Sequence, residues 1–220
     1  MKILTRLAVF ALLLGSVAST ASAFAGDART CHLPPITGSQ GGLQYGQTVG
    51  VLYSEHTVEN LQYLEQYHSV AVNGAKNALD ARIRQAFVDS SDPQLAIDWL
   101  LSSLHKSFLS VTVYDNLDAL VQAHPDVVVM LDTHNQLLTQ RNDRVEARFA
   151  ARFYDASLQY IGKAEGAVEK QLPSVWVHDK TAPEIAAQIE QQRDLQLTAL
   201  KQFDASLKAL VSAGLTAATH

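Results

Sequence analysis

Eight histidines are spread along the 220 residues of this chain, and imidazole is the commonest metal ligand in proteins. None of them belongs to an HExxH motif or to another compact ligand pair. Asp132 and His134 are two residues apart, so on a strand they share a face, and Asp115 stands at the end of another predicted strand. These three residues are the candidate metal ligands. The alternative is that His134 lies in a polar loop and binds no metal. We favour this alternative, and we predict that the protein holds no metal and no cofactor.

Other catalytic patterns are absent from the sequence. There is no GxSxG motif, and Cys31 has no Cys-His context. The glycines at 38–42 lack the lysine and the helix start of a phosphate-binding loop. Aspartates near strand ends, such as Asp126 and Asp155, usually cap helices or shape turns. We therefore predict no catalytic residues and a protein that is not an enzyme.

Three arginines are spaced four residues apart in one predicted strand, at Arg144, Arg148 and Arg152, with Glu146 between them. Side chains of a strand alternate between its two faces, so these four line one outer face. One interpretation is a solvated face that also protects an edge strand from pairing. The other is a docking surface for an acidic partner. The three arginines are our candidate partner-binding residues.

The strand that carries them, residues 144–155, alternates apolar and charged side chains more clearly than any other segment. Residues 158–170 are predicted to pair with it. Its small residues at 162, 164 and 166 leave room for a helix to approach closely. Shorter strands are predicted at 47–54, 108–115 and 126–132, the last being apolar enough for a central strand covered on both faces.

Helical periodicity predicts the remaining elements. A long helix is expected over 57–88, with Gly74 weakening its middle by about 1 kcal/mol relative to alanine. Further helices are predicted after Asp92, over 116–124, and from Thr181, where Thr181 and Glu184 form a capping box, to about Gly214. Together the elements predict an α/β fold with a mixed sheet of about four to five strands, covered by long helices in two or three layers. The strand order is not determined by the sequence.

The N-terminus has the features of a secretory signal peptide at residues 1–23. Lys2 and Arg6 precede a short apolar run, and a small-x-small cleavage site follows at 21–23. Lipid anchoring at Cys31 is the rival interpretation, but Arg29 stands where a lipobox requires a small or apolar residue. We predict a flexible leader at 24–47, one α/β domain at 48–216 and a tail at 217–220.

Composition narrows the partners of this chain. Its formal charge is −5 and there is no dense basic run, which argues against a nucleic acid. A single cysteine excludes an internal disulfide, so an exported form depends on its core for stability. The sequence leaves open the oligomeric state and a peripheral position at a membrane.

The order of elements from about Val49 to Gln171 resembles that of small bacterial envelope proteins. The segments that carry the resemblance are VGVLYS, SFLSVTVYDNLDAL, HPDVVVMLD and VEARFAARFYDASLQYIGKAEGAV. Proteins of this pattern include the periplasmic part of the curli-secretion lipoprotein, the N-terminal domain of the Tol translocation protein and lipoprotein activators of penicillin-binding proteins. The resemblance implies a docking or assembly module without shared catalytic residues. This chain departs from the lipoprotein members, which place a lipidated cysteine directly at the cleavage site.

These observations favour a non-enzymatic periplasmic accessory or assembly protein that binds another envelope protein. The alternative function is a periplasmic protein that binds a small ligand or a metal through Asp115, Asp132 and His134. A hydrolase with an unrecognised site is a third hypothesis.

Overall fold

The computed structural model describes residues 42–74, 80–138, 143–173 and 180–217, with no side chain described at Gly74 or at 215–217. The predicted signal peptide and most of the predicted leader lie outside these ranges. The elements, in chain order, are β1 (Thr48–Tyr53), α1 (Glu55–Ser69), a π-helical segment (Val70–Gly74), α2 (Ala81–Ser90), α3 (Gln94–Ser107), β2 (Ser110–Val113), α4 (Leu117–Ala123), β3 (Val127–Gln136), β4 (Arg144–Asp155), β5 (Tyr160–Gln171) and α5 (Ala182–Ala217).

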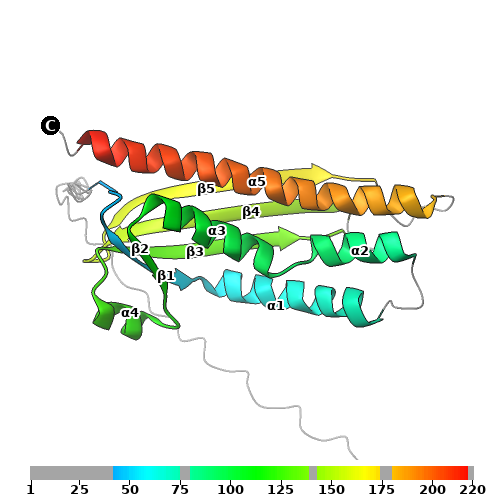
Figure 1. Cartoon of the computed structure of the whole chain (residues 1–220), viewed down its shortest axis with the longest axis horizontal. Helices are drawn as coiled ribbons and strands as arrows, with labels where there is room; N and C mark the ends of the chain where they lie inside the picture. Colours follow the sequence, from blue (N-terminus) through cyan, green and yellow to red (C-terminus); the bar gives the residue numbers. More distant parts are fainter. Residues whose placement is uncertain (1–41, 75–79, 139–142, 174–179, 218–220) are drawn as a thin grey trace, which may run out of the picture. The chain divides into compact units, whose positions relative to one another are not determined.

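The strands form one mixed sheet in the order β2-β1-β3-β4-β5 (Figure 1). β1 is parallel to both of its neighbours, β2 and β3. β4 and β5 continue the sheet as antiparallel strands. The predicted mixed α/β fold is confirmed, and the strand order that the sequence left open is now defined.

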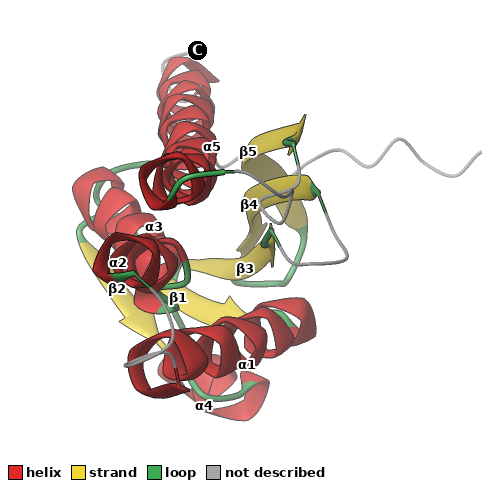
Figure 2. Cartoon of the chain, turned by 90° about the vertical axis from the view of Figure 1, so that its right-hand side faces the viewer, coloured by secondary structure: helices red, strands yellow, loops and turns green. Residues whose placement is uncertain are grey.

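Helices α2, α3 and α5 lie on one side of the sheet (Figure 2). The main core lies between the sheet and α3 and α5, and its largest buried side chains include Phe108, Phe149, Phe153 and Phe203. A smaller cluster joins α2 to α5 through Ile83 and Ile189. Leu43, within the predicted leader, belongs to the main core and is only 1% exposed.

The small residues of β5 admit α5, as the sequence predicted. A Cβ atom added to Gly166 would lie 1.9 Å from the backbone oxygen of Ala199 and 2.5 Å from the backbone nitrogen of Phe203. α5 therefore packs directly on the β5 backbone. The capping box at its start is also present, because the Glu184 carboxylate accepts hydrogen bonds from the backbone and the hydroxyl of Thr181. These bonds lower the pKa of Glu184.

The helix predicted over 57–88 is not continuous. α1 ends at Ser69, a π-helical segment reaches Gly74, and α2 starts at Ala81. The glycine that weakens the helical pattern is the last residue of the π-helical segment. Asp80 begins the second helix by accepting a hydrogen bond from the backbone of Arg82.

Two strand boundaries also differ from the prediction. β2 is shorter than predicted, because only Ser110–Val113 pair with β1. β3 continues beyond Asp132 to Gln136, so His134 lies in a strand and the polar-loop interpretation of its position is wrong. The extension follows from pairing, because Thr133 through Gln136 are all in register with β4.

Candidate binding surface on the open face of the sheet

The face of β3, β4 and β5 opposite α5 is covered by no helix in the described part of the chain (Figure 2). Alternation along the strands decides what it carries. Phe149, Ala151 and Phe153 point toward the helices, and Arg148 and Arg152 point the other way. We call this surface the open face. Its charged side chains are Arg144, Arg148, Arg152, Lys163, Asp132, Glu146, Glu165 and Glu169.

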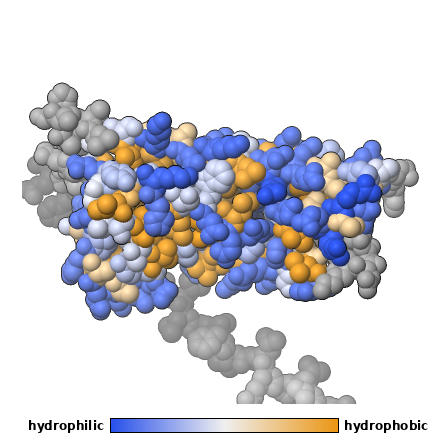
Figure 3. Space-filling view, in the orientation of Figure 1, coloured by the Kyte–Doolittle hydropathy of each residue, from blue (hydrophilic) through white to orange (hydrophobic). Residues whose placement is uncertain are grey.

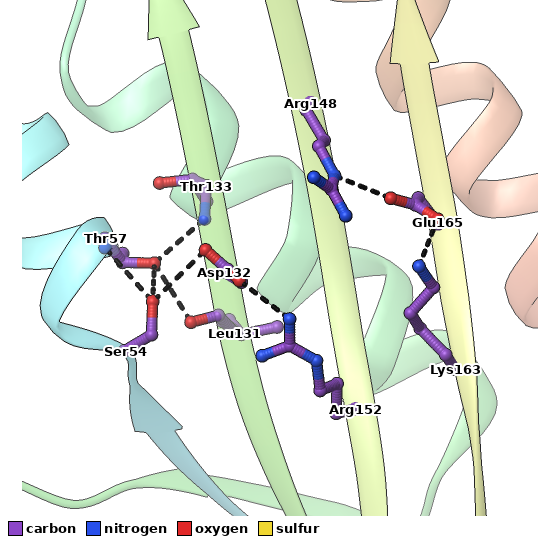
Figure 4. A network of polar contacts seen from close by, with 9 residues as sticks. All are labelled: Ser54, Thr57, Leu131, Asp132, Thr133, Arg148, Arg152, Lys163 and Glu165. Carbon is purple, nitrogen blue, oxygen red and sulfur yellow. Dashed lines mark hydrogen bonds and ion pairs between the residues drawn. The ribbon is translucent and has the colours of Figure 1, made fainter.

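Opposite charges on the open face are paired across neighbouring strands (Figure 4). Arg148 Nε donates to Glu165 Oε1 at 2.7 Å, and Lys163 binds the other carboxylate oxygen of Glu165. Arg152 donates to Asp132 Oδ2 at 3.1 Å, and Arg144 lies 2.7 Å from Glu169. Among the described residues of the open face, four cations meet four carboxylates, so their formal charges sum to zero.

The pKa of Glu165 is lowered by its two cationic neighbours. The hydrogen bond from Lys163 has the largest effect, and the bond from Arg148 adds to it. Both stabilise the charged carboxylate more than the neutral acid. Glu165 is therefore a fixed negative charge of the open face at neutral pH.

α1 lies beside β3 beyond the point where β1 ends. Ser54 caps this helix, because its hydroxyl accepts from the Thr57 backbone at 3.1 Å. The backbone N–H groups of Thr133 and Asn135 then donate to Thr57 Oγ1 and Asn60 Oδ1, at 2.9 and 2.8 Å. Side chains of a helix thus take the place of a neighbouring strand along this edge of β3, and we call these contacts the α1 seal.

The α1 seal is completed by Tyr63, whose hydroxyl accepts from the Leu137 backbone at 3.4 Å. Burial raises the pKa of Tyr63 to about 12, so it stays a neutral phenol. Three residues advance a helix by about 4.5 Å, whereas two residues advance a strand by about 6.6 Å. Because the helix advances less than the strand between contacts, the gap to be spanned grows along α1. A longer side chain is therefore needed at each successive contact.

A hollow of about 510 Å³ lies where α1 meets the open face. The α1 end contributes Ser54 and His56, and the strands contribute the rest of its lining: Asp132, His134, Glu146, Arg148 and Arg152. Asp132 is fixed there by Arg152 and by a 3.4 Å hydrogen bond from the Ser54 hydroxyl. The hollow therefore offers both signs of charge to a polar group.

The residues predicted from the sequence are only partly brought together. Arg148, Arg152, Asp132 and His134 line the same hollow. Asp115 follows β2, which β1 separates from β3, so it does not join the other two candidate ligands. The described residues contain no group of three His, Cys, Asp or Glu side chains that could hold a metal ion.

Sequence reasoning missed the charged residues that β5 contributes to the open face. Lys163, Glu165 and Glu169 alternate along β5 with small or apolar residues, and this pattern was a usable signal. It was obscured because the glycines and alanines of β5 conceal the difference between the two faces. Ser54 and His56 had no signal in the sequence, because their position depends on the contact between α1 and β3.

Comparisons with known proteins leave the family of this chain undefined. No family model matches the sequence, and no curated protein matches it. Similar solved structures include a PelC dodecamer from Paraburkholderia phytofirmans, with 12% identity, a TM-score of 0.32, and coverage of 73% of this chain and 91% of that chain. A minor lipoprotein from Acinetobacter baumannii has 13% identity and a TM-score of 0.24, and covers 72% and 93% of the two chains.

A putative neuraminyllactose-binding hemagglutinin homolog from Helicobacter pylori has 11% identity, a TM-score of 0.25, and coverage of 77% of this chain and 95% of that chain. The minor lipoprotein and the hemagglutinin homolog are proteins of the envelope type. With TM-scores this low, the three likenesses carry no argument about this chain. None of its described helices has the length and apolar character needed to cross a membrane.

Proposed function

We propose that this chain is a non-enzymatic accessory protein of the bacterial periplasm, and that it binds an envelope protein through the open face. The observation that carries the proposal is the paired rows of charge on β3, β4 and β5, which no described helix covers. The predicted signal peptide supports the location, and the pattern of elements over 49–171 supports the class of protein.

The open face suits recognition better than proton transfer. Asp132 is held by Arg152, and Glu165 by Lys163 and Arg148. The two cations lower the pKa of Glu165, so its carboxylate is a weak base. Charges fixed in position favour a partner with the complementary pattern and repel others. The described residues of the open face carry positive and negative charges in equal number, so we expect the partner surface to carry both as well. The arginines alone had indicated an acidic partner.

Crosslinking in the native envelope tests this directly. A photoreactive amino acid at Ala167, which is exposed and in register with Arg148 on the open face, should give one discrete crosslinked product. The same amino acid at Ala205, exposed on α5, is the matched control and should not give that product. Crosslinking that is equal at both positions, or absent at both, would contradict the proposal.

A second pair of variants keeps the chemistry of the substitution constant. Arg148→Gln and Arg193→Gln each remove one exposed arginine that has an acidic neighbour, the first on the open face and the second on α5. We expect Arg148→Gln to reduce the crosslinked product at Ala167 by about tenfold, and Arg193→Gln to leave it unchanged. Equal thermal melting curves for the two variants would show that the loss comes from the surface and not from unfolding.

The predicted location has its own test. The intact mass of the protein recovered from the periplasm should correspond to a chain that begins at Phe24. A mass that corresponds to a lipidated chain beginning at Cys31 would instead support membrane anchoring.

The hollow beside α1 supports a second candidate function, binding of a small polar ligand. Its lining combines arginine, histidine and carboxylate side chains from three elements. Native mass spectrometry of the untagged protein should then show an added mass that is lost in Arg152→Gln. A protein that carries no added mass in either form, together with crosslinking at Ala167, would favour the protein-binding proposal.

A further inference from the structure

β2 differs from every other strand edge in the described part of the chain. It is one of the two outermost strands, and only β1 pairs with it, whereas the backbone of the other, β5, donates hydrogen bonds to α5. Tyr114 donates its backbone N–H to Val51, so Tyr114 and Thr112 direct their backbone groups toward β1. By alternation, the backbone groups of Val111 and Val113 point outward, away from the sheet, whereas Leu109 lies in the bend just before the strand.

This outer edge is short, with four residues, but it has no charged residue or proline to prevent pairing. Natural edge strands carry charged residues, prolines or bulges that prevent pairing with another chain. From Ser107 to Tyr114 the sequence SFLSVTVY contains no charge and no proline. Leu109 is 65% exposed and Val113 is 40% exposed. The space-filling view shows hydrophobic residues gathered in the half of the surface where β2 and α3 lie (Figure 3).

The charges beyond the two ends of β2 have opposite signs. Lys106 precedes the strand, and Asp115 and Asp118 follow it. Lys106 is in the last turn of α3, directly before the strand. An antiparallel second copy of β2 places the end of the strand that follows the lysine beside the end of the other copy that precedes the aspartates, and twofold symmetry makes this happen twice. A parallel copy would place like charges together. The edge is therefore complementary to itself in the antiparallel direction.

The outward backbone groups also define a register. Antiparallel strands exchange hydrogen bonds between residues that both point toward the partner. With Val111 opposite Val111 of the second copy, Val113 lies beside the bend that carries Leu109 of the other copy, on both sides of the twofold axis. Val111 and Val113 lie on one face of the strand, and Leu109 is exposed in the bend before it, so the residues at the contact are apolar.

We propose that two copies of this chain associate through β2, antiparallel and centred on Val111, so that their sheets become one continuous sheet. The observations that carry this are the uncharged outer edge, the exposed Leu109 and Val113, and the opposite charges at the two ends of the strand. The contact uses no residue of the open face, so the proposal stands or falls separately from the proposed function.

The first test measures association of the mature chain by sedimentation velocity over a range of concentrations. The wild-type protein should form a dimer. Thr112→Lys adds a charge to the exposed edge and should weaken the dimer by at least about tenfold. Gln62→Lys adds the same charge on α1, where the position is also exposed, and should leave the dimer unchanged. A monomeric wild type, or a dimer that Thr112→Lys does not weaken, would overturn the proposal.

The second test reads the register. In a Cys31→Ser background, Val111→Cys should form a disulfide-linked dimer on mild oxidation, because residue 111 meets its own symmetry mate within the distance a disulfide spans. Val113→Cys is the matched control, since residue 113 lies beside the bend that carries Leu109 of the second copy. It should crosslink at least about tenfold less. Equal crosslinking of the two variants would contradict this register, even if the dimer forms.

Discussion

The outer edges at the two ends of the sheet differ in whether another element of the described chain covers them. At the β5 end, the backbone N–H groups of Glu165 and Ala167 donate to Ser206 and Gln202 of α5, at 3.1 and 3.2 Å. At the other end, β2 presents an apolar, uncharged edge that no described element covers. Inside the sheet, the α1 seal protects β3 beyond the end of β1. Of these edges, only that of β2 has backbone groups without a covering element in the described part of the chain. We therefore expect a second copy to associate there.

The largest expected effect comes from the sealed β5 end. Gly166→Ala should destabilise the fold by about 3 kcal/mol, because the new Cβ would lie 1.9 Å from a backbone oxygen of α5. Thermal unfolding of the variant measures the loss. Gly46→Ala is the control, since no atom lies within 4 Å of its Cβ position. Similar melting temperatures for the two variants would show that α5 does not rest on β5.

Breaking the α1 seal should have the next largest effect. Thr57→Val keeps the shape of the side chain but leaves the buried N–H of Thr133 without an acceptor. An unsatisfied buried donor costs about 1–3 kcal/mol. Chemical denaturation should show this loss, whereas Gln202→Ala, which removes an exposed acceptor on α5 at the β5 edge, should change stability by less than about 0.5 kcal/mol. A loss at Gln202 as large as that at Thr57 would mean that the two seals are equivalent.

The open face should make the fold sensitive to acid. The folded pKa of Glu165 lies below its ordinary value of 4.5, so its contribution to stability is present above pH 4.5 and is lost as the pH falls through the folded pKa. Glu165→Gln should weaken this dependence below pH 4.5 and cost less than about 1 kcal/mol at pH 7, because the pair is near the surface. Unfolding titrations at several pH values measure both. An unchanged acid dependence would assign it to other carboxylates.

The smallest effect on stability is expected at the unsealed edge. Thr112→Lys should change the free energy of unfolding of the monomer by less than about 0.5 kcal/mol, because its side chain is exposed. The measurement is made at a concentration low enough to keep the protein monomeric. A large loss would mean that β2 is a stabilising strand, and the contrast between the two ends of the sheet would disappear.

The parts of the fold that were predictable from sequence depend on neighbours along the chain. The alternation of β4 predicted its bounds of 144–155 and the face that carries Arg148 and Arg152. The Thr181–Glu184 capping box predicted the start of α5. In both cases the decisive contacts join residues that are close in sequence or follow a fixed period, so the pattern is visible in one dimension.

The remaining features depend on contacts between distant segments. The bond between Thr133 and Thr57 spans 76 residues, and nothing in the sequence near either residue indicates it. The extension of β3 to Gln136 depends on pairing with β4, and the position of Asp115 depends on strand order. The open face was therefore half predictable, through its arginines, and the hollow beside α1 was not.

The stepwise reach of the α1 seal has a consequence for local opening. Its bonds to Thr133 and Asn135 are 2.9 and 2.8 Å long, whereas the bond from Leu137 to Tyr63 is 3.4 Å. Longer side chains hold their partners less firmly, and the π-helical segment at Val70–Gly74 follows at that same end of α1. Amide hydrogen exchange along β3 should therefore accelerate from residue 133 to residue 137. We expect α1 to separate from β3 first at its contact with Leu137 and last at its contact with Thr133.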